Sequence, residues 1–213
     1  MTDSSAAAGL SSGRPKKSWL PMALTITRLA LAPVIAGLIL WAAAVLYTDR
    51  LLAGFVYALA TILFVLASLS DWLDGWLARK LDAVTPLGAA LDHCADKVLV
   101  TCALIALAYA ALELNLVVAA VIILGRDVAV AGLREGLSSA GRALPVSQIG
   151  KWKAAAEMAG VTAYLAYQAS ALLFVPARVV LGLDWTATGL IWIAAGLALV
   201  SGARYVWAAT RSA

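Results

Sequence analysis

The chain has 213 residues, of which 63% are hydrophobic and 13% charged, and its formal net charge is +4. This length corresponds to one domain, and the composition is too apolar for a soluble one. The small positive charge fits anionic lipids and phosphates, and no basic patch interleaved with aromatic residues indicates nucleic-acid binding. The composition therefore predicts an integral membrane protein.

Residues 1–17 are small, polar and mildly basic, and we expect them to form a disordered N-terminal tail. The apolar run that follows is too long for a signal peptide, and Arg28 interrupts its start. These features favour a retained first helix over a cleaved leader. We expect residues 18–213 to form a single membrane domain.

Six apolar runs follow along the chain. Four contain no charge, and each is about as long as the 20 residues that an α-helix needs to cross a bilayer. Two shorter runs, Val98–Leu112 and Leu114–Gly125, reach that length only by including charged residues on one side. The sequence therefore predicts an all-α bundle of six transmembrane helices, in which the charge-free runs are Leu29–Thr48, Leu51–Ser70, Met158–Ala177 and Trp185–Ala203.

The placement of Lys and Arg predicts the orientation of this bundle. With the N-terminus inside, only Arg50 and Arg178 fall on the outer side. Cytoplasmic loops carry the excess of Lys and Arg in most membrane proteins, so both termini are expected in the cytoplasm. The residues that then lie at cytoplasmic loops or helix ends are Arg14, Lys16, Lys17, Arg79, Lys80, Arg142, Lys151, Lys153 and Arg211.

Four carboxylates interrupt the apolar sequence at Asp71, Asp74, Asp92 and Asp96. Ionisable groups in a membrane segment are costly unless they face a partner, an ion or water, and four groups of one sign cannot neutralise each other. Spacings of three and four place each pair on one helix face. Two such faces would form an oxygen-lined pocket for one or two Mg²⁺ or Mn²⁺ ions.

The same residues carry a family signature. The pattern is Asp71-x-x-Asp74-Gly75-x-x-Ala78-Arg79, then eight residues, then Gly88-x-x-x-Asp92-x-x-x-Asp96. It resembles the CDP-alcohol phosphotransferases at every fixed position. Within that family the chain resembles the bacterial phosphatidylglycerophosphate synthases, through the segments Leu24–Arg28, Gly125–Asp127, Leu133–Glu135 and Ile149–Lys153.

The resemblance implies an enzyme that transfers the phosphatidyl group of CDP-diacylglycerol to sn-glycerol 3-phosphate, releasing CMP. It implies two metal ions, Mg²⁺ or Mn²⁺, one held by Asp71, Asp74 and Asp92 and the other by Asp71, Asp92 and Asp96. It further implies that Asp96 is the general base for the acceptor hydroxyl and that the protein is a homodimer in the cell (inner) membrane. By the same resemblance, contacts with CDP-diacylglycerol fall on Thr25, Gly75, Ala78, Arg79, Thr85 and Gly88.

A group of cations follows the signature. Arg126 and Arg134 are eight residues apart, which is about two helical turns, so they share a helix face. Lys151 and Lys153 begin the next helix, and both are also suited to snorkelling at a helix end. We interpret these four residues as a site for the phosphate of the acceptor, with Arg28 and Lys97 as possible neighbours.

Two positions depart from the family pattern, because His93 and Met22 stand where relatives usually have proline and asparagine. His93 points about 100° away from Asp92 on a helix, which argues against a catalytic role. Three alternative functions stay open. Two are within the family, a cardiolipin synthase and a phosphatidylinositol-phosphate-type synthase. The third is a cation transporter, although neither repeated halves nor broken helices support it.

Overall fold

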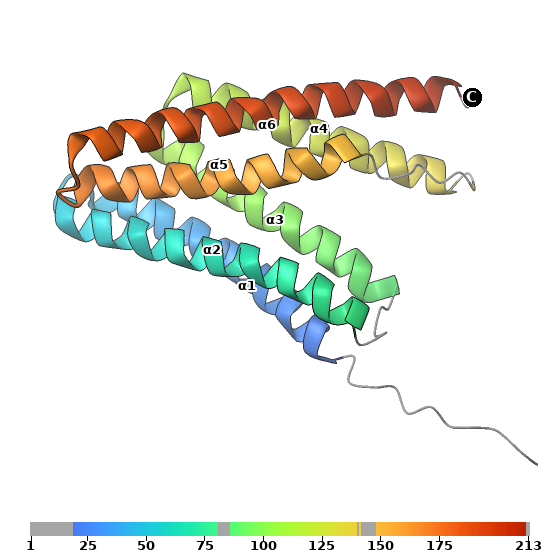
Figure 1. Cartoon of the computed structure of the whole chain (residues 1–213), viewed down its shortest axis with the longest axis horizontal. Coiled ribbons are helices and arrows are strands. Elements are labelled where there is room, and N and C mark those ends of the chain that lie inside the picture. The colour runs from blue at the N-terminus through green and yellow to red at the C-terminus, as the bar shows by residue number, and fades with distance from the viewer. Residues whose placement is uncertain (1–18, 81–85, 140, 142–147, 212–213) are drawn as a thin grey trace, which may run out of the picture.

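In the computed structural model, the described residues form six α-helices and no strand (Figure 1). The prediction of an all-α bundle of six helices is confirmed. The predicted tail, residues 1–17, lies outside the described residues. The description covers residues 19–80, 86–139, 141 and 148–211, without the side chains of 19–21, 71–80, 86–87, 89, 209 and 211. The helices are α1 (Trp19–Val45), α2 (Arg50–Lys80), α3 (Pro86–Ala111), α4 (Leu114–Ser139), α5 (Gln148–Leu172) and α6 (Ala177–Arg211).

Three tight connections join the helices in pairs. Before α2, the Asp49 carboxylate accepts a hydrogen bond of 2.9 Å from the backbone N–H of Leu52, which caps the helix. Between α3 and α4, Leu112 adopts a positive φ of 52°. Figure 1 shows the α1–α2 and α5–α6 turns at one end of the bundle and the C-terminus at the other.

The charge-free run Met158–Ala177 does not coincide with one helix. Helix α5 begins at Gln148, close to Lys151 and Lys153 as predicted, but it ends at Leu172, and α6 begins at Ala177 rather than near Trp185. Phe174 has a left-handed φ of 50°, and Pro176 lacks the backbone N–H that a continuing helix would need. The apolar run hides this break because Leu, Phe, Val and Ala continue through the turn.

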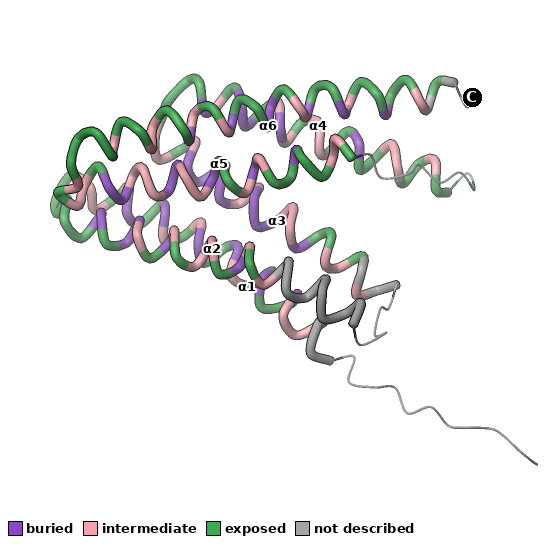
Figure 2. The backbone as a smooth tube through the Cα atoms, in the orientation of Figure 1, coloured by how far each residue is buried: buried purple, intermediate pink, exposed green. Residues whose placement is uncertain are grey.

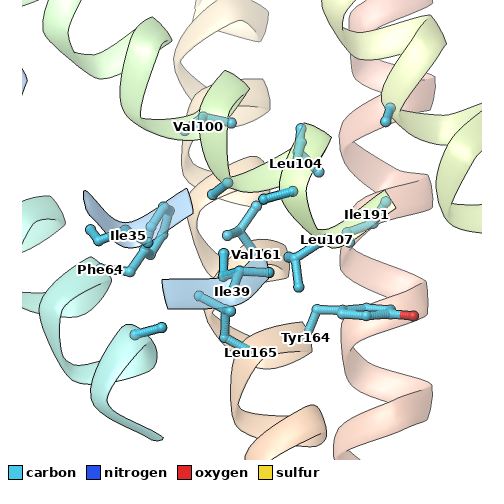
Figure 3. Packing of buried hydrophobic residues seen from close by; sticks show 14 of the residues in the cluster. Ile35, Ile39, Phe64, Val100, Leu104, Leu107, Val161, Tyr164, Leu165 and Ile191 are labelled. Atoms are coloured by element: carbon cyan, nitrogen blue, oxygen red, sulfur yellow. The ribbon is translucent and has the colours of Figure 1, made fainter. Parts of the chain in front are cut away.

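The buried core contains residues from all six described helices. Ile35 and Ile39 of α1 and Phe64 of α2 face α3 and α5, as Figure 3 shows. Helices α5 and α6 approach closely at Gly160, where an added Cβ would lie 2.8 Å from Cγ1 and 3.2 Å from the backbone N of Ile191. The other labelled core residues are Val100, Leu104, Leu107, Val161, Tyr164 and Leu165.

The outer surface is apolar too. In Figure 2 the buried positions face the interior of the bundle and the exposed positions face outward. Many exposed side chains are large and hydrophobic, among them Ile62, Leu69 and Val121. A soluble protein rarely exposes such surface, whereas a bilayer covers it. The chain is therefore a multi-pass membrane protein.

Five of the six described helices are long and apolar enough to cross a membrane. Helix α5 is the exception by composition, because Lys151, Lys153 and Glu157 lie within its first ten residues. Lys153 and Glu157 are nevertheless buried within the bundle. Two of these three charged side chains therefore face other helices, as expected for ionisable groups at membrane depth.

Candidate active site

Two of the four signature aspartates are fixed by a buried arginine of another helix. Asp92 and Asp96 lie on one face of α3, and Arg28 of α1 lies beneath them with its side chain 0% exposed. Its Nη1 donates to Oδ1 of Asp92 at 3.2 Å and to Oδ1 of Asp96 at 2.6 Å. The two carboxylates remain 37% and 27% exposed, respectively. The two carboxylates therefore meet at the same guanidinium nitrogen of Arg28, and both stay accessible to solvent or a ligand.

The other two aspartates lie on the end of α2. The helix continues to Lys80, so Asp71 and Asp74 are helical and three residues apart, as predicted. With a rise of about 1.5 Å per residue, Asp71 lies roughly 14 Å before the end of α2, and Asp96 roughly 15 Å after the start of α3. The two pairs therefore lie at similar depths on consecutive helices. The side chains of both α2 aspartates lie outside the described residues.

The predicted nucleotide contacts are only partly described. Thr25 is buried one turn before Arg28 on α1, and Gly88 is half-buried in the first turns of α3. Gly75, Ala78 and Arg79 continue the helix α2, but their side chains lie outside the described residues, as does all of Thr85. For these residues the role in binding the donor stays a prediction.

A second polar cluster centres on Asp127 of α4. Its Oδ1 accepts hydrogen bonds of 2.5 Å from Lys153 Nζ and 2.9 Å from Arg126 Nη1. Its Oδ2 lies 3.7 Å from Lys97 Nζ. One carboxylate thus gathers cations from α3, α4 and α5. This arrangement keeps several positive charges close together at a small cost in mutual repulsion.

Lys153 also contacts a second carboxylate. Its Nζ lies 2.6 Å from Oε1 of Glu157, one turn further along α5, and the two side chains are 4% and 5% exposed. Burying a charge is costly unless it is paired, and Lys153 is paired on both sides. The ammonium is therefore held in one place, and Asp127 and Glu157 determine that place.

A cavity of about 140 Å³ joins Asp96 to these cations. Asp96 lies on its wall together with Arg126 and Lys153. The space is about ten times what one water molecule needs, which is enough for a small ionic molecule. Its charged lining is completed by Lys97, Asp127, Arg134 and Glu157, and its other walls include His93 and Tyr205.

Most of the predicted acceptor site comes together here. Arg126, Arg134 and Lys153 line one cavity, as the spacing of the two arginines predicts. Lys151 is exposed and is not among the lining residues. His93, which helix geometry directs away from Asp92, also lines the cavity.

Three features of these polar clusters were not predicted from the sequence. These are the pairing of Arg28 with Asp92 and Asp96, the central position of Asp127, and the buried carboxylate of Glu157. A signal for all of them exists, because each is an ionisable residue next to or within an apolar run. That signal marks a residue as functional without naming its partner.

Comparison with known protein families identifies the family of the chain. The sequence model of the CDP-alcohol phosphatidyltransferase family matches residues 18–200. The chain belongs to this family. The match includes all four signature aspartates and the cations of the cavity, and it ends within α6.

Other CDP-alcohol phosphatidyltransferases resemble this chain along most of its length. The CDP-diacylglycerol–glycerol-3-phosphate 3-phosphatidyltransferase of Bacillus subtilis is 38% identical over 151 residues, which are 68% of this chain and 76% of that protein. The protein of the same name from Rickettsia bellii is 35% identical over 189 residues, covering 87% of this chain and 92% of that protein. A cardiolipin synthase (CMP-forming) of rice is 34% identical over 199 residues, and this chain (88% covered) spans 56% of its length.

Proposed function

We propose that the chain transfers the phosphatidyl group of CDP-diacylglycerol to sn-glycerol 3-phosphate, giving phosphatidylglycerophosphate and CMP. The observation that carries this proposal is the single cavity in which Asp96 lies beside Arg126 and Lys153. A proton-accepting carboxylate next to a group of cations suits an acceptor that has both a hydroxyl and a phosphate. The names of the Bacillus subtilis and Rickettsia bellii relatives support the same reaction.

In this reaction the primary hydroxyl of glycerol 3-phosphate attacks the phosphorus that carries the diacylglycerol. A new P–O bond forms there, and the bond from that phosphorus to the CMP oxygen breaks, so that CMP leaves with the electron pair. Asp96 takes the proton of the hydroxyl as the attack proceeds. Arg126, Arg134 and Lys153 hold the acceptor phosphate, so that the hydroxyl is directed toward the aspartates.

The aspartates fit a divalent metal site. Asp92 and Asp96 lie on one face of α3, the two carboxylates are oriented by Arg28 and stay partly exposed, and carboxylate oxygens are the preferred ligands of Mg²⁺ and Mn²⁺. The described residues contain no group of three or more His, Cys, Asp or Glu side chains that could hold a metal ion. The proposed site therefore adds Asp71 and Asp74 of α2. Bound ions would neutralise the charge of the diphosphate during transfer.

The distribution of Lys and Arg supports a cytoplasmic setting for the reaction. By the positive-inside rule, the end of the bundle with the aspartates is expected on the cytoplasmic side of the inner membrane, where a soluble phosphorylated acceptor is available. The diacyl chains of the donor reach the site from the bilayer. The homodimer implied by the family resemblance stays a prediction.

A release assay for CMP tests the proposal. The purified protein is supplied with CDP-diacylglycerol and, in separate reactions, with glycerol 3-phosphate, glycerol, phosphatidylglycerol or inositol phosphate. We expect glycerol 3-phosphate to support the fastest release. In Arg126→Ala, the KM for glycerol 3-phosphate should rise roughly 10- to 100-fold, because a charge-assisted hydrogen bond is lost. Arg126→Lys should restore part of the affinity, since an ammonium cannot reproduce paired donation by a guanidinium.

A cardiolipin synthase is the second candidate, and one feature favours it. An apolar groove of about 580 Å³ between α4 and α6 shares Arg126 and Val130 with the polar cavity, and it would suit the acyl chains of a lipid acceptor. If phosphatidylglycerol proves the better acceptor, or if Arg126→Ala leaves the acceptor KM unchanged, the glycerol 3-phosphate assignment is wrong.

A further inference from the structure

The guanidinium of Arg126 is held from a second helix. Its Cζ lies 5.6 Å from the centroid of the Tyr205 ring of α6. Tyr205 is 7% exposed, and the Arg126 side chain is 11% exposed. An aromatic ring at this distance attracts a cation through its negative face, and the attraction is stronger where water is excluded. Tyr205 and Arg126 both line the cavity.

Gly202 makes room for the stem of the same arginine. It lies three residues before Tyr205, so the two share a face of α6. A Cβ added at Gly202 would lie 3.1 Å from Cγ of Arg126, which is too close unless the arginine moves by a few tenths of an ångström. At the other three glycines of α6, Gly182, Gly189 and Gly196, an added Cβ would meet nothing within 4 Å.

Arg126 keeps capacity for a further hydrogen bond. Its Nη1 donates to Asp127 at 2.9 Å, while its Nε is buried and has no hydrogen-bond partner among the described residues. A buried donor without a partner is costly, so the Arg126 side chain would gain from a rearrangement that gives its Nε an acceptor such as an anion. The N–H donors of a guanidinium lie in its plane, so an aromatic ring that contacts its face does not occupy them.

We propose that Gly202 and Tyr205 are positioning residues that hold Arg126 for the phosphate of the acceptor and so determine acceptor selectivity. The inference rests on the proposed function, in which Arg126 binds that phosphate. Both residues lie beyond residues 18–200, the part that the family model matches.

The first experiment compares substitutions of Tyr205 in the CMP-release assay. Tyr205→Leu should raise the KM for glycerol 3-phosphate about 3- to 30-fold, because the cation–π contact is lost. The KM for CDP-diacylglycerol and kcat should stay within about twofold, since an effect confined to the acceptor KM is the sign of lost acceptor binding. Tyr205→Phe keeps the ring and should retain near-normal kinetics, whereas a merely structural role would lower the yield of folded protein and kcat.

The second experiment uses the glycines of α6 as a matched pair. Gly202→Leu should displace Arg126 and raise the acceptor KM roughly 10- to 100-fold, as expected for misplacement of a binding group. Gly196→Leu changes the same helix at an exposed position with open space and should behave like the wild type. If Tyr205→Leu does not fold, Gly202→Ala against Gly196→Ala repeats the comparison with a smaller change.

Double substitutions separate the role of Tyr205 from that of Arg126. In an Arg126→Ala background, Tyr205→Leu should add no further rise in the acceptor KM, because the residue that it positions is gone. If Arg126→Ala raises the acceptor KM but neither Tyr205→Leu nor Gly202→Leu does, the positioning inference is overturned and the proposed function stands. If Arg126→Ala itself has no effect on the acceptor KM, the assignment of Arg126 to the acceptor fails first.

Discussion

Arg28 on α1 donates a hydrogen bond of 2.6 Å to Asp96 on α3, across 68 residues of sequence. The arginine is buried, and the same nitrogen also reaches Asp92. Hydrogen-bond donors behind metal-binding carboxylates orient them and tune their affinity. The contact therefore places Arg28 in a supporting role for the proposed metal site.

Arg28→Ala should raise the Mg²⁺ concentration needed for half-maximal activity about 10- to 100-fold, because the two carboxylates lose the donor that orients them. Arg28→Lys should raise this Mg²⁺ concentration less, because a donor is kept. The measurement is a metal titration of CMP release. Thr27→Ala, at an exposed neighbouring position, is the control. An unchanged metal requirement in folded Arg28→Ala would show that the arginine serves only packing.

Asp92→Asn and Asp71→Asn should each abolish transfer, because both are proposed to bridge the two ions. The proteins should still fold, and their elution as single species in detergent checks this. EDTA should inhibit the wild type, and Mg²⁺ or Mn²⁺ should restore activity. Full turnover in EDTA would contradict metal dependence.

Asp96→Asn should eliminate catalysis and retain much of the binding of CDP-diacylglycerol. The general base is lost, whereas Asp71, Asp74 and Asp92 remain for the first ion. Donor binding is measured directly, by calorimetry in detergent micelles. A loss of donor binding equal to that in Asp71→Asn would mean that Asp96 acts mainly as a metal ligand.

Lys153→Met should destabilise the protein by about 3–5 kcal/mol, because Asp127 and Glu157 lose a buried partner. The double variant Lys153→Met/Glu157→Met should be more stable than Lys153→Met, since one uncompensated carboxylate is gone. Unfolding in SDS-containing mixed micelles measures both. Lys151→Met, at an exposed position outside the cavity, is the matched control. Additive effects at residues 153 and 157 would show that the two do not interact.

Gly160→Ala should destabilise the bundle by about 1–3 kcal/mol, because overpacking separates the helices. The new Cβ would lie 3.2 Å from the backbone nitrogen of Ile191, which cannot rotate away as a side chain can. Gly189→Ala brings the same gain in helix propensity, and its Cβ would meet nothing within 4 Å. This variant should therefore leave the stability of the protein unchanged or raise it. Equal stability of the two variants in the same unfolding assay would contradict close packing of α5 on α6.

The helices and the signature could be predicted from the sequence because both are local properties. A charge-free run of about 20 residues predicts a membrane helix by its length. Asp92 and Asp96 share a face because the helical repeat puts residues four apart on one side. The end of α5 was not predicted, and the reason is local as well. Phe174 and Pro176 lie in a turn inside an apolar run, and the composition of that run does not change at the turn.

Which charges meet was decided only by the tertiary structure. Arg28 pairs with Asp96, and Lys153 with Asp127, across different helices, and these contacts depend on how each helix is rotated about its axis. That rotation is determined by packing of side chains such as Phe64 and Ile191 along the whole interface, which no short segment records. The approach of Tyr205 to Arg126 is of the same kind, because it depends on the packing of α6 against both α4 and α5.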